Sequence, residues 1–364
     1  MFKKIIIAGL TAIFVSGAPM IATAITNGFV EIDNFTSLFA PRASRVISDY
    51  GFDEKLAYEN PNLNFHTAEP LSDGENISPI SEKNPLPYPD FKNLTAQSAK
   101  IVPTTYGKSS GNSYINLDIA GQVRNKTTVP NTALLEESRK YPEWKIDFNS
   151  NEPQVLIMHT HTTECFEEFE REYYDNSFGY RTTDPRYNMV AVGEEIKKEL
   201  EKLGICTIHD DTINDYPKYN GAYDRSAEVV KEYLRKYPGI KVVLDIHRDA
   251  ITNSDGSLAQ PVAEINGKKA AQIMIISGCD NGTYNMPNYM KNFRFSSLLQ
   301  SQLEYENPGL TRPILFDYRH YNQELTTGSI LIEVGSHGNT LEQVKYSGQL
   351  IGKSLAHSLM KIKS

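Results

Sequence analysis

From about residue 155 to the C-terminus, short apolar runs alternate with longer segments in which apolar residues recur every three or four positions. Short apolar runs are typical of buried strands, and the longer period is typical of amphipathic helices. Strands are predicted at 155–158, 241–246, 270–277 and 329–334, and helices at 187–203, 225–237, 288–305 and 341–361. This alternation predicts an α/β fold with an open, mostly parallel sheet and helices on both faces.

The N-terminus has the pattern of an export signal. Lys3 and Lys4 precede an apolar run from Ile5 to about residue 25. A cationic start before an apolar core is typical of secretion signals, and Ala22-Thr23-Ala24 has the form of a cleavage site. The run is also long enough to span a bilayer. Residues 1–25 are therefore predicted to be either a cleaved signal or a retained membrane anchor, with the rest of the chain outside the cytoplasm.

Residues 26–108 show no sustained helical or strand period, and 78–89 read SPISEKNPLPYP, rich in proline, serine and charge. This composition predicts an irregular stalk or linker, with a short helix near residues 37–50. The pattern changes at about residue 109. Three parts are thus expected: the export segment 1–25, the stalk 26–108 and a catalytic domain over 109–364.

Composition narrows the function. The 364 residues carry a formal net charge of −8 at pH 7. A nucleic-acid binder would normally present a basic face, so no nucleic-acid partner is expected. Cys165, Cys206 and Cys279 are odd in number and widely spaced, so they imply no disulfide framework.

Ionisable residues follow three of the predicted strands. In open α/β sheets, sites form at the carboxyl ends of strands, so these residues are expected to meet. A charge without a partner at a buried strand end is costly in free energy. Three strands that each lead into ionisable residues are therefore better explained by one shared site than by chance. The first strand leads into His159, His161 and Glu164, the second into His247, Arg248 and Asp249, and the fourth carries Glu333 with His337 just after.

These residue types suit a catalytic zinc site. Catalytic Zn²⁺ takes three nitrogen or oxygen ligands and one water. His161 and Glu164 have an H-x-x-E spacing that lets one turn supply two ligands, and His247 completes the set. Zinc lowers the pKa of bound water to about 7. A separate carboxylate must then carry the proton to the leaving group, and Glu333 is placed for that role.

Several alternatives stay open at this point. His159 competes with His161, because alternate residues of an extended segment point in opposite directions. Asp184 competes with Glu164. Arg248 is expected either to polarise the scissile carbonyl or hold a substrate carboxylate, or to form a salt bridge with Asp249. No ligand role is assigned to His66, His209, His320 or His357, and Asn322 is interpreted as a turn residue.

The segments VLIMHTHTTECF, VVLDIHRDA and GSILIEVGSHGNT, in this order, resemble the stage II sporulation protein P family. The resemblance covers roughly residue 109 to the C-terminus. It implies hydrolysis of the amide between N-acetylmuramic acid and L-Ala in peptidoglycan, with cleavage of peptide cross-links as well. It also implies a membrane-anchored protein facing the cell wall, acting in septal thinning and engulfment during endospore formation. The implied partners are stage II sporulation proteins D and M.

A more distant likeness is to zinc carboxypeptidases, which use H-x-x-E, a later His and a Glu general base in that order. His161, Glu164, His247 and Glu333 match this order. Zinc-dependent cell-wall amidases place their middle ligand before a helix, which keeps Asp184 in consideration. Two rival functions remain at this stage: a peptidase that cuts only cross-links, and a non-catalytic wall-binding scaffold.

Overall fold

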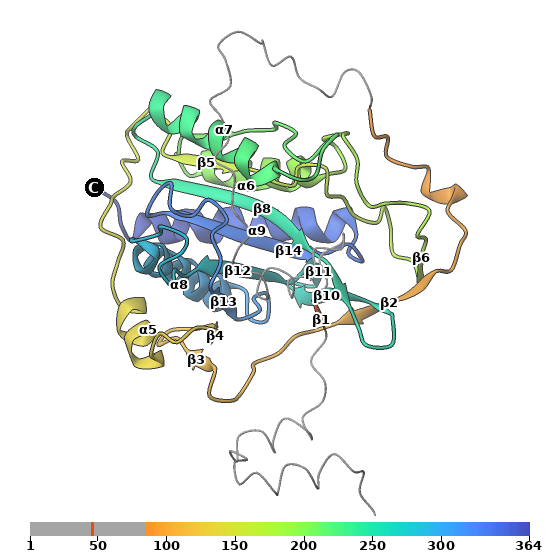
Figure 1. Ribbon diagram of the computed structural model, residues 1–364, viewed down its shortest axis with the longest axis horizontal. Coiled ribbons are helices and arrows are strands. Elements are labelled where there is room, and N and C mark those ends of the chain that lie inside the picture. The colour runs from red at the N-terminus through yellow and green to blue at the C-terminus, as the bar shows by residue number, and fades with distance from the viewer. Residues whose placement is uncertain (1–44, 47–84) are drawn as a thin grey trace, which may run out of the picture. The chain divides into compact units, whose positions relative to one another are not determined.

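The computed structural model describes residues 45–46 and 85–364, and its elements form two sheets with helices packed against the larger one (Figure 1). The larger sheet has eight strands within the described residues, in the order β3-β4-β13-β12-β14-β8-β5-β7. The smaller sheet runs β1-β9-β10-β2-β6, with β11 added to β10. The strands are β1 Arg45–Val46, β2 Ala99–Thr104, β3 Tyr114–Asn116, β4 Gln122–Asn125, β5 Val155–Met158, β6 Tyr173–Tyr174, β7 Thr207–His209, β8 Val242–Asp249, β9 Ile251–Thr252, β10 Leu258–Ile265, β11 Lys268–Ala271, β12 Ile273–Gly278, β13 Ile314–Asp317 and β14 Ser329–Ser336. The helices are α5 Asn131–Ser138, α6 Met189–Lys202, α7 Ala222–Lys236, α8 Tyr289–Glu306, α9 Leu341–Met360 and the 3-10 turn η3 Phe91–Asn93.

The α/β fold class is confirmed, but the larger sheet is mixed in direction. β7, β5, β8 and β14 are parallel to one another, and so are β12, β13 and β4. The two blocks meet antiparallel between β14 and β12, where Glu333 lies opposite Met274. Two parallel strands need a crossover connection. The chain instead leaves β8 through β9, β10 and β11 of the smaller sheet and enters β12, which runs antiparallel to β14.

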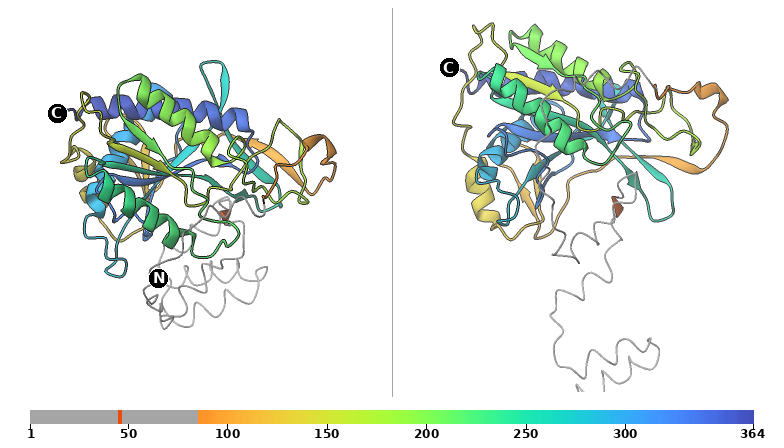
Figure 2. Two further views of the ribbon diagram at one scale, coloured as in Figure 1. Left: turned by 90° about the horizontal axis from the view of Figure 1, so that it is seen from above. Right: turned by 45° about the horizontal axis from the view of Figure 1, so that its top comes forward.

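Helices cover the two faces of the sheet unequally. Val242, Leu244 and Ile246 of β8 belong to a large core with α6, α8 and α9, whereas Val243 packs with α7 on the opposite face. Figure 2 (left) shows α6 and α9 together on one side of the sheet and α7 on the other. α9 packs closely against α6 at Gly352. A Cβ atom at this position would lie only 2.6 Å from the carbonyl oxygen of Ile196, so glycine permits the close approach.

Residues 85–98, here called the N-terminal strap, pack against the loop between β5 and α6. Leu86 and Thr183 exchange two hydrogen bonds: the Leu86 N–H donates to Thr183 Oγ1 at 3.0 Å, and the Thr183 N–H donates to the Leu86 carbonyl at 2.8 Å. The ring of Tyr88 stacks on Tyr187 with centroids 4.1 Å apart. Phe91 is buried among the aromatic rings of the same loop. The folded part therefore begins before residue 109, where the stalk was expected to end.

Residues 99–108 are also part of the fold. β2 pairs in parallel with β10, with Ile101 opposite Leu258. The apolar pattern does not predict this strand, because only one of its six residues is buried. Its partner also lies more than 150 residues away, in a hairpin that the pattern does not separate from β12.

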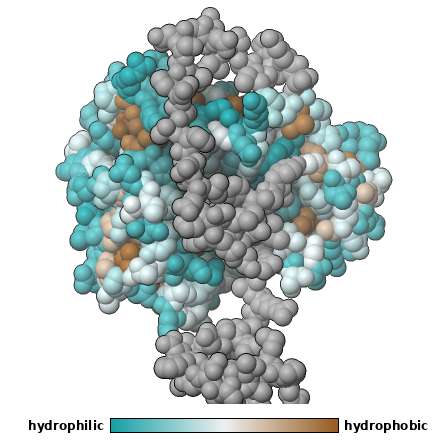
Figure 3. Space-filling model, viewed as in Figure 1, coloured by the Kyte–Doolittle hydropathy of each residue, from teal (hydrophilic) through white to brown (hydrophobic). Residues whose placement is uncertain are grey.

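The export segment 1–25 lies outside the described residues. So does most of the helix expected near 37–50, of which only Arg45–Val46 is described, as a strand paired with β9. Within residues 45–46 and 85–364, no helix combines the length and apolar content needed to cross a membrane. Cys165, Cys206 and Cys279 are free thiols in the structure. In Figure 3 the visible coloured surface is mostly hydrophilic, with apolar groups in small separate patches.

The strap can be tested with Phe91→Ala. Phe91 is about 1% exposed, and removing a buried aromatic ring costs about 3–5 kcal/mol of unfolding free energy. We expect a loss of that size in urea unfolding monitored by circular dichroism. Lys92→Ala, at the exposed neighbouring position, is the control and should change stability by less than about 0.5 kcal/mol. Equal effects of the two substitutions would contradict the packed strap.

Candidate active site

The candidate site lies where β5, β8 and β14, three adjacent parallel strands, reach their carboxyl ends. His247 of β8 and Glu333 of β14 are directly opposite each other in register. Side chains alternate between the faces of a strand. Asp245 and His247 therefore share the face of Val243, and Glu333 points away from the core that holds Ile332 and Val334. The site is thus on the face that packs against α7.

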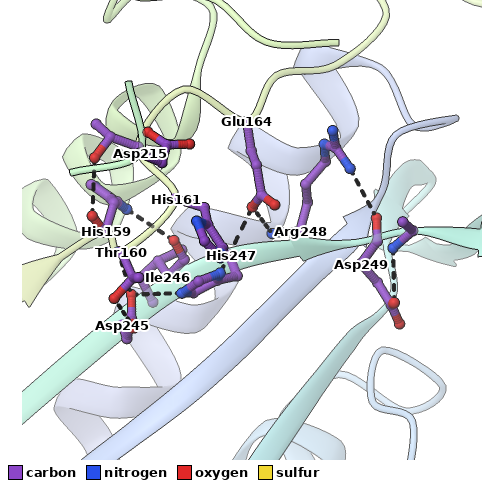
Figure 4. A network of polar contacts seen from close by, with 12 residues as sticks. His159, Thr160, His161, Glu164, Asp215, Asp245, Ile246, His247, Arg248 and Asp249 are labelled. Carbon is purple, nitrogen blue, oxygen red and sulfur yellow. Dashed lines mark hydrogen bonds and ion pairs between the residues drawn. The ribbon is translucent and has the colours of Figure 1, made fainter. Parts of the chain in front are cut away.

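His247 is surrounded by carboxylates (Figure 4). Its Nε2 lies 2.8 Å from Asp245 Oδ1, and its Nδ1 lies 3.8 Å from Glu164 Oε2. Burial opposes the charged imidazole, but Asp245, Glu164 and Glu333 outweigh burial and raise the pKa of His247 to about 9. Asp245 is itself fixed, because it accepts hydrogen bonds from the N–H and hydroxyl of Thr160 at 2.8 and 2.7 Å. A carboxylate behind a His is the arrangement that orients metal-binding imidazoles.

His161 sits on the turn after β5, with its ring perpendicular to that of His247 at 5.1 Å between centroids. Its other side stacks on Tyr219, whose hydroxyl lies 3.1 Å from His161 Nε2. Burial first, and then the positive charges of His247, Arg181 and Arg248, hold the pKa of His161 well below its usual value. The imidazole is therefore neutral, which is the form that binds metals. Its Nδ1 is buried without a hydrogen-bond partner among the described residues.

Glu164 lies three residues further along the same turn. Its Oε2 accepts a hydrogen bond from the Arg248 backbone N–H at 3.2 Å, and its Oε1 lies 3.7 Å from Arg181 Nη2. Burial raises the pKa of Glu164, whereas Arg248, His247 and Arg181 lower it and only partly offset the burial. Glu164 and His247 are thus brought together, as the sequence predicted.

Glu333 is partly exposed as a residue, but its Oε2 atom is buried and has no hydrogen-bond partner among residues 45–46 and 85–364. Burial, followed by the negative charge of Asp249, raises the pKa of Glu333 to about 8. A carboxyl group that titrates near neutral pH can both accept and donate a proton, as a general acid–base catalyst must.

His159, the competitor of His161, points to the other face of the sheet. Its Nδ1 lies 3.0 Å from the Ile246 carbonyl, and its Nε2 lies 2.9 Å from His209 Nε2. Complete burial lowers the pKa of His159 to about 3. Both ring nitrogens are occupied beneath Gly193 of α6, so the structure brings His161 and not His159 to the site.

Asp184, the competitor of Glu164, forms an ion pair with Arg186 at 2.5 Å instead of facing His161 or His247. Asn322 occupies a turn with φ 55°, as expected. His320 and His357 contact Glu324 and Glu306, while His66 lies outside the described residues.

Arg248 was predicted either to contact substrate, which stays a prediction, or to pair with the side chain of Asp249. Its guanidinium instead donates to the backbone carbonyls of Cys165 at 3.0 Å and Tyr180 at 3.1 Å, and to the Asp249 carbonyl at 3.3 Å. Figure 4 shows this guanidinium directed away from His161 and His247. The Asp249 carboxylate pairs with Arg312 at 2.9 Å. Arg248 thus joins the loop that carries Glu164 to the end of β8.

Four further groups shape the site and were not predicted from the sequence. Asp245 could have been found, because it lies two positions before His247 on the same face of a predicted strand. Arg181 bridges Glu164 and Asp215, with its Nη1 2.6 Å from Asp215 Oδ2, and lies 4.9 Å above the Tyr219 ring. The other three groups are Arg181, Asp215 and Tyr219. They lie in irregular segments that show no apolar period in the sequence.

In the described part of the chain, no group of three or more His, Cys, Asp or Glu side chains is arranged closely enough to hold a metal ion. The chemistry of the predicted donor set nevertheless fits zinc: two imidazoles and one carboxylate lie in one continuous cluster, and His161 Nδ1 is buried without a partner. Two His and one carboxylate are a common catalytic zinc set.

The fold and the site define an α/β protein with a buried imidazole–carboxylate cluster at the carboxyl ends of parallel strands. The chain belongs to the family Stage II sporulation protein P (SpoIIP), which matches residues 76–356. It is 28% identical over 202 residues to the stage II sporulation protein P of Bacillus subtilis (strain 168). That alignment covers 52% of this chain and 47% of the relative, so the chain spans about half the length of that protein.

Solved structures of amidases align less closely. The CwlD amidase of Clostridioides difficile, in complex with the GerS lipoprotein, is 13% identical and has a TM-score of 0.36, with 57% of this chain and 98% of that chain covered. The N-acetylmuramoyl-L-alanine amidase AmiC2 of Nostoc punctiforme is 11% identical with a TM-score of 0.33, covering 58% of this chain and 98% of its own. At scores this low the likeness carries no argument about fold or function.

Arg248→Lys tests whether Arg248 is structural. A lysine ammonium cannot reach three carbonyls in the planar geometry of a guanidinium. We expect the unfolding free energy to fall by about 2–3 kcal/mol, the scale of a lost charged hydrogen bond in a buried site. Urea unfolding measures this loss. Arg139→Lys, at an exposed pair with Asp118, is the matched control. Unchanged stability in Arg248→Lys would argue for a direct substrate contact instead.

Proposed function

We propose that the protein is a peptidoglycan hydrolase that cleaves the amide between N-acetylmuramic acid and L-Ala. The observation that carries this proposal is the meeting of His161, Glu164, His247 and Glu333 on one face of the sheet. Membership of the SpoIIP family supports it. The cluster joins potential metal ligands to a separate carboxyl group, which is the combination that amide hydrolysis by activated water needs.

In this proposal His161, Glu164 and His247 would hold Zn²⁺, which would supply an activated water and polarise the scissile carbonyl. Asp245 keeps the His247 ring in place from behind. Glu333 accepts the proton of the attacking water. It then delivers that proton to the leaving amino group of L-Ala, because an amide nitrogen leaves only when protonated. A pKa raised to about 8 suits both halves of this task.

The biological setting follows from the family and is proposed with it. The protein would act outside the cytoplasm, tethered or secreted through residues 1–25, on the wall between mother cell and forespore. Septal thinning and engulfment during sporulation need such a hydrolase. Stage II sporulation proteins D and M are the proposed partners.

The proposal predicts different outcomes for two substitutions in the cluster. Glu333→Gln keeps the shape of the side chain but removes proton transfer, so activity should fall by about 10²–10⁴-fold with zinc still bound. His247→Ala removes a ligand and should lose both zinc and activity. Zinc content by elemental mass spectrometry and turnover on purified peptidoglycan separate the two. Glu264→Gln, at an exposed position of β10, is the control for charge removal. Full activity of Glu333→Gln would exclude Glu333 from the mechanism.

The bond cleaved can be read directly from the products. Purified protein is incubated with peptidoglycan with and without a chelator, and the products are analysed by mass spectrometry. We expect stem peptides with a free L-Ala amino end, released only without chelator. Release of cross-link fragments alone would assign an endopeptidase. Retained activity in the chelator would reject zinc, and no release with wall binding retained would favour a scaffold.

A further inference from the structure

A second buried charged group lies beside the proposed catalytic cluster. Arg312 precedes β13 and is about 7% exposed. Its Nη1 donates to Asp249 Oδ2 at 2.9 Å, and Asp249 is the last residue of β8, two positions after His247. The Arg312 side chain therefore reaches the end of the strand that carries the proposed ligand. No motif in the sequence pointed to this residue.

The guanidinium of Arg312 is fixed from a second direction. Its Cζ lies 5.8 Å from the centre of the Tyr106 ring. Tyr106 is itself held through its backbone, because its N–H donates to Gln272 Oε1 at 2.7 Å and its carbonyl accepts from Gln272 Nε2 at 2.9 Å. A cation between a carboxylate and an aromatic face has little freedom to rotate. The donors of Arg312 are thus held in place before any ligand arrives.

Two of these donors are unused. Nε and Nη2 of Arg312 are buried and have no hydrogen-bond partner in the described part of the chain. They lie on the same edge of the guanidinium and form a two-pronged fork, which matches the two oxygens of a carboxylate. A buried charged donor without a partner is costly, so such a fork is expected where a ligand supplies the missing acceptors.

The Arg312–Asp249 pair lies at the end of the same two strands that carry His247 and Glu333. Asp249 lies opposite Ser336 of β14, a few residues beyond the pairing of His247 with Glu333. The charges of both Asp249 and Arg312 act on the Glu333 carboxyl group. Asp249 accepts a hydrogen bond from Nη1 of Arg312, so Nε and Nη2 stay available to donate to another acceptor.

We propose that Arg312 binds a carboxylate of the stem peptide on the leaving-group side of the scissile amide, and so selects acidic over amidated peptides. This inference rests on the proposed function. The lactyl carboxyl of the muramic acid is consumed in the amide, and the N-acetylated sugars carry no carboxylate. The free carboxylate closest to the scissile bond therefore belongs to the peptide.

The test compares two synthetic muramoyl peptides that differ only in whether the second residue has a free α-carboxylate or an α-carboxamide. The wild-type protein should prefer the carboxylate in kcat/KM by about tenfold or more, the effect of one charge-assisted fork. Arg312→Lys keeps a cation for Asp249 but removes the fork, and Arg312→Met removes both. In both variants the preference should fall to about twofold or less. Arg139→Met, at an exposed site, should keep the wild-type preference.

Urea unfolding of each variant separates folding from recognition, and Arg312→Lys is the variant that keeps the Asp249 partner. A wild-type preference near one, or a preference retained in folded Arg312→Lys, would overturn the proposal. If wild-type protein cleaves neither peptide, the proposed function fails. In that case the affinities of the two peptides for the wild-type and Arg312→Lys proteins are measured by calorimetry. A preference for the carboxylate peptide in the wild type that is lost in Arg312→Lys would still support the role of Arg312.

Discussion

The parallel pairing of β8 with β14 is the constraint on which the rest of the site depends. It places His247 and Glu333 side by side with their side chains on one face. A shift of one residue in either strand would turn that side chain into the core on the opposite face. Ile246, Ile332 and Val334 fix the register, since they fill the core beneath α6, α8 and α9. The hydrophobic face of the sheet thus sets the geometry of its polar face.

The polar face is stable because its buried charges alternate in sign. Asp245 and Glu164 face His247, Arg181 joins Glu164 to Asp215, and Arg312 pairs with Asp249. Isolated charges at such depth would cost several kcal/mol each, so every one needs a partner. The atoms left over are informative for this reason. His161 Nδ1, Glu333 Oε2 and the fork of Arg312 lack partners within the described residues.

The loop between β5 and α6 connects the N-terminal strap to this site. It carries Glu164 and Arg181, which form a bridge with each other, and it is held on its outer side by Leu86, Tyr88 and Phe91. Arg248 holds the same loop from the inside through the carbonyls of Cys165 and Tyr180. A long loop without regular structure keeps a ligand in place only when it is braced in this way.

The α/β class, the central strands and helices, and the strand ends that lead to His161, Glu164, His247 and Glu333 could all be predicted from the sequence. These follow from local patterns, because the apolar period within one segment records which face is buried. The mixed direction of the sheet, the choice of His161 over His159, and the different contacts of Arg248 and Arg312 depend instead on tertiary packing. Each of these two arginines lies at or near the end of a strand, so the sequence alone does not distinguish them. One guanidinium meets backbone carbonyls of a distant loop, whereas the other meets Asp249 and Tyr106. Contacts between segments so far apart in the chain produce no apolar period in either segment.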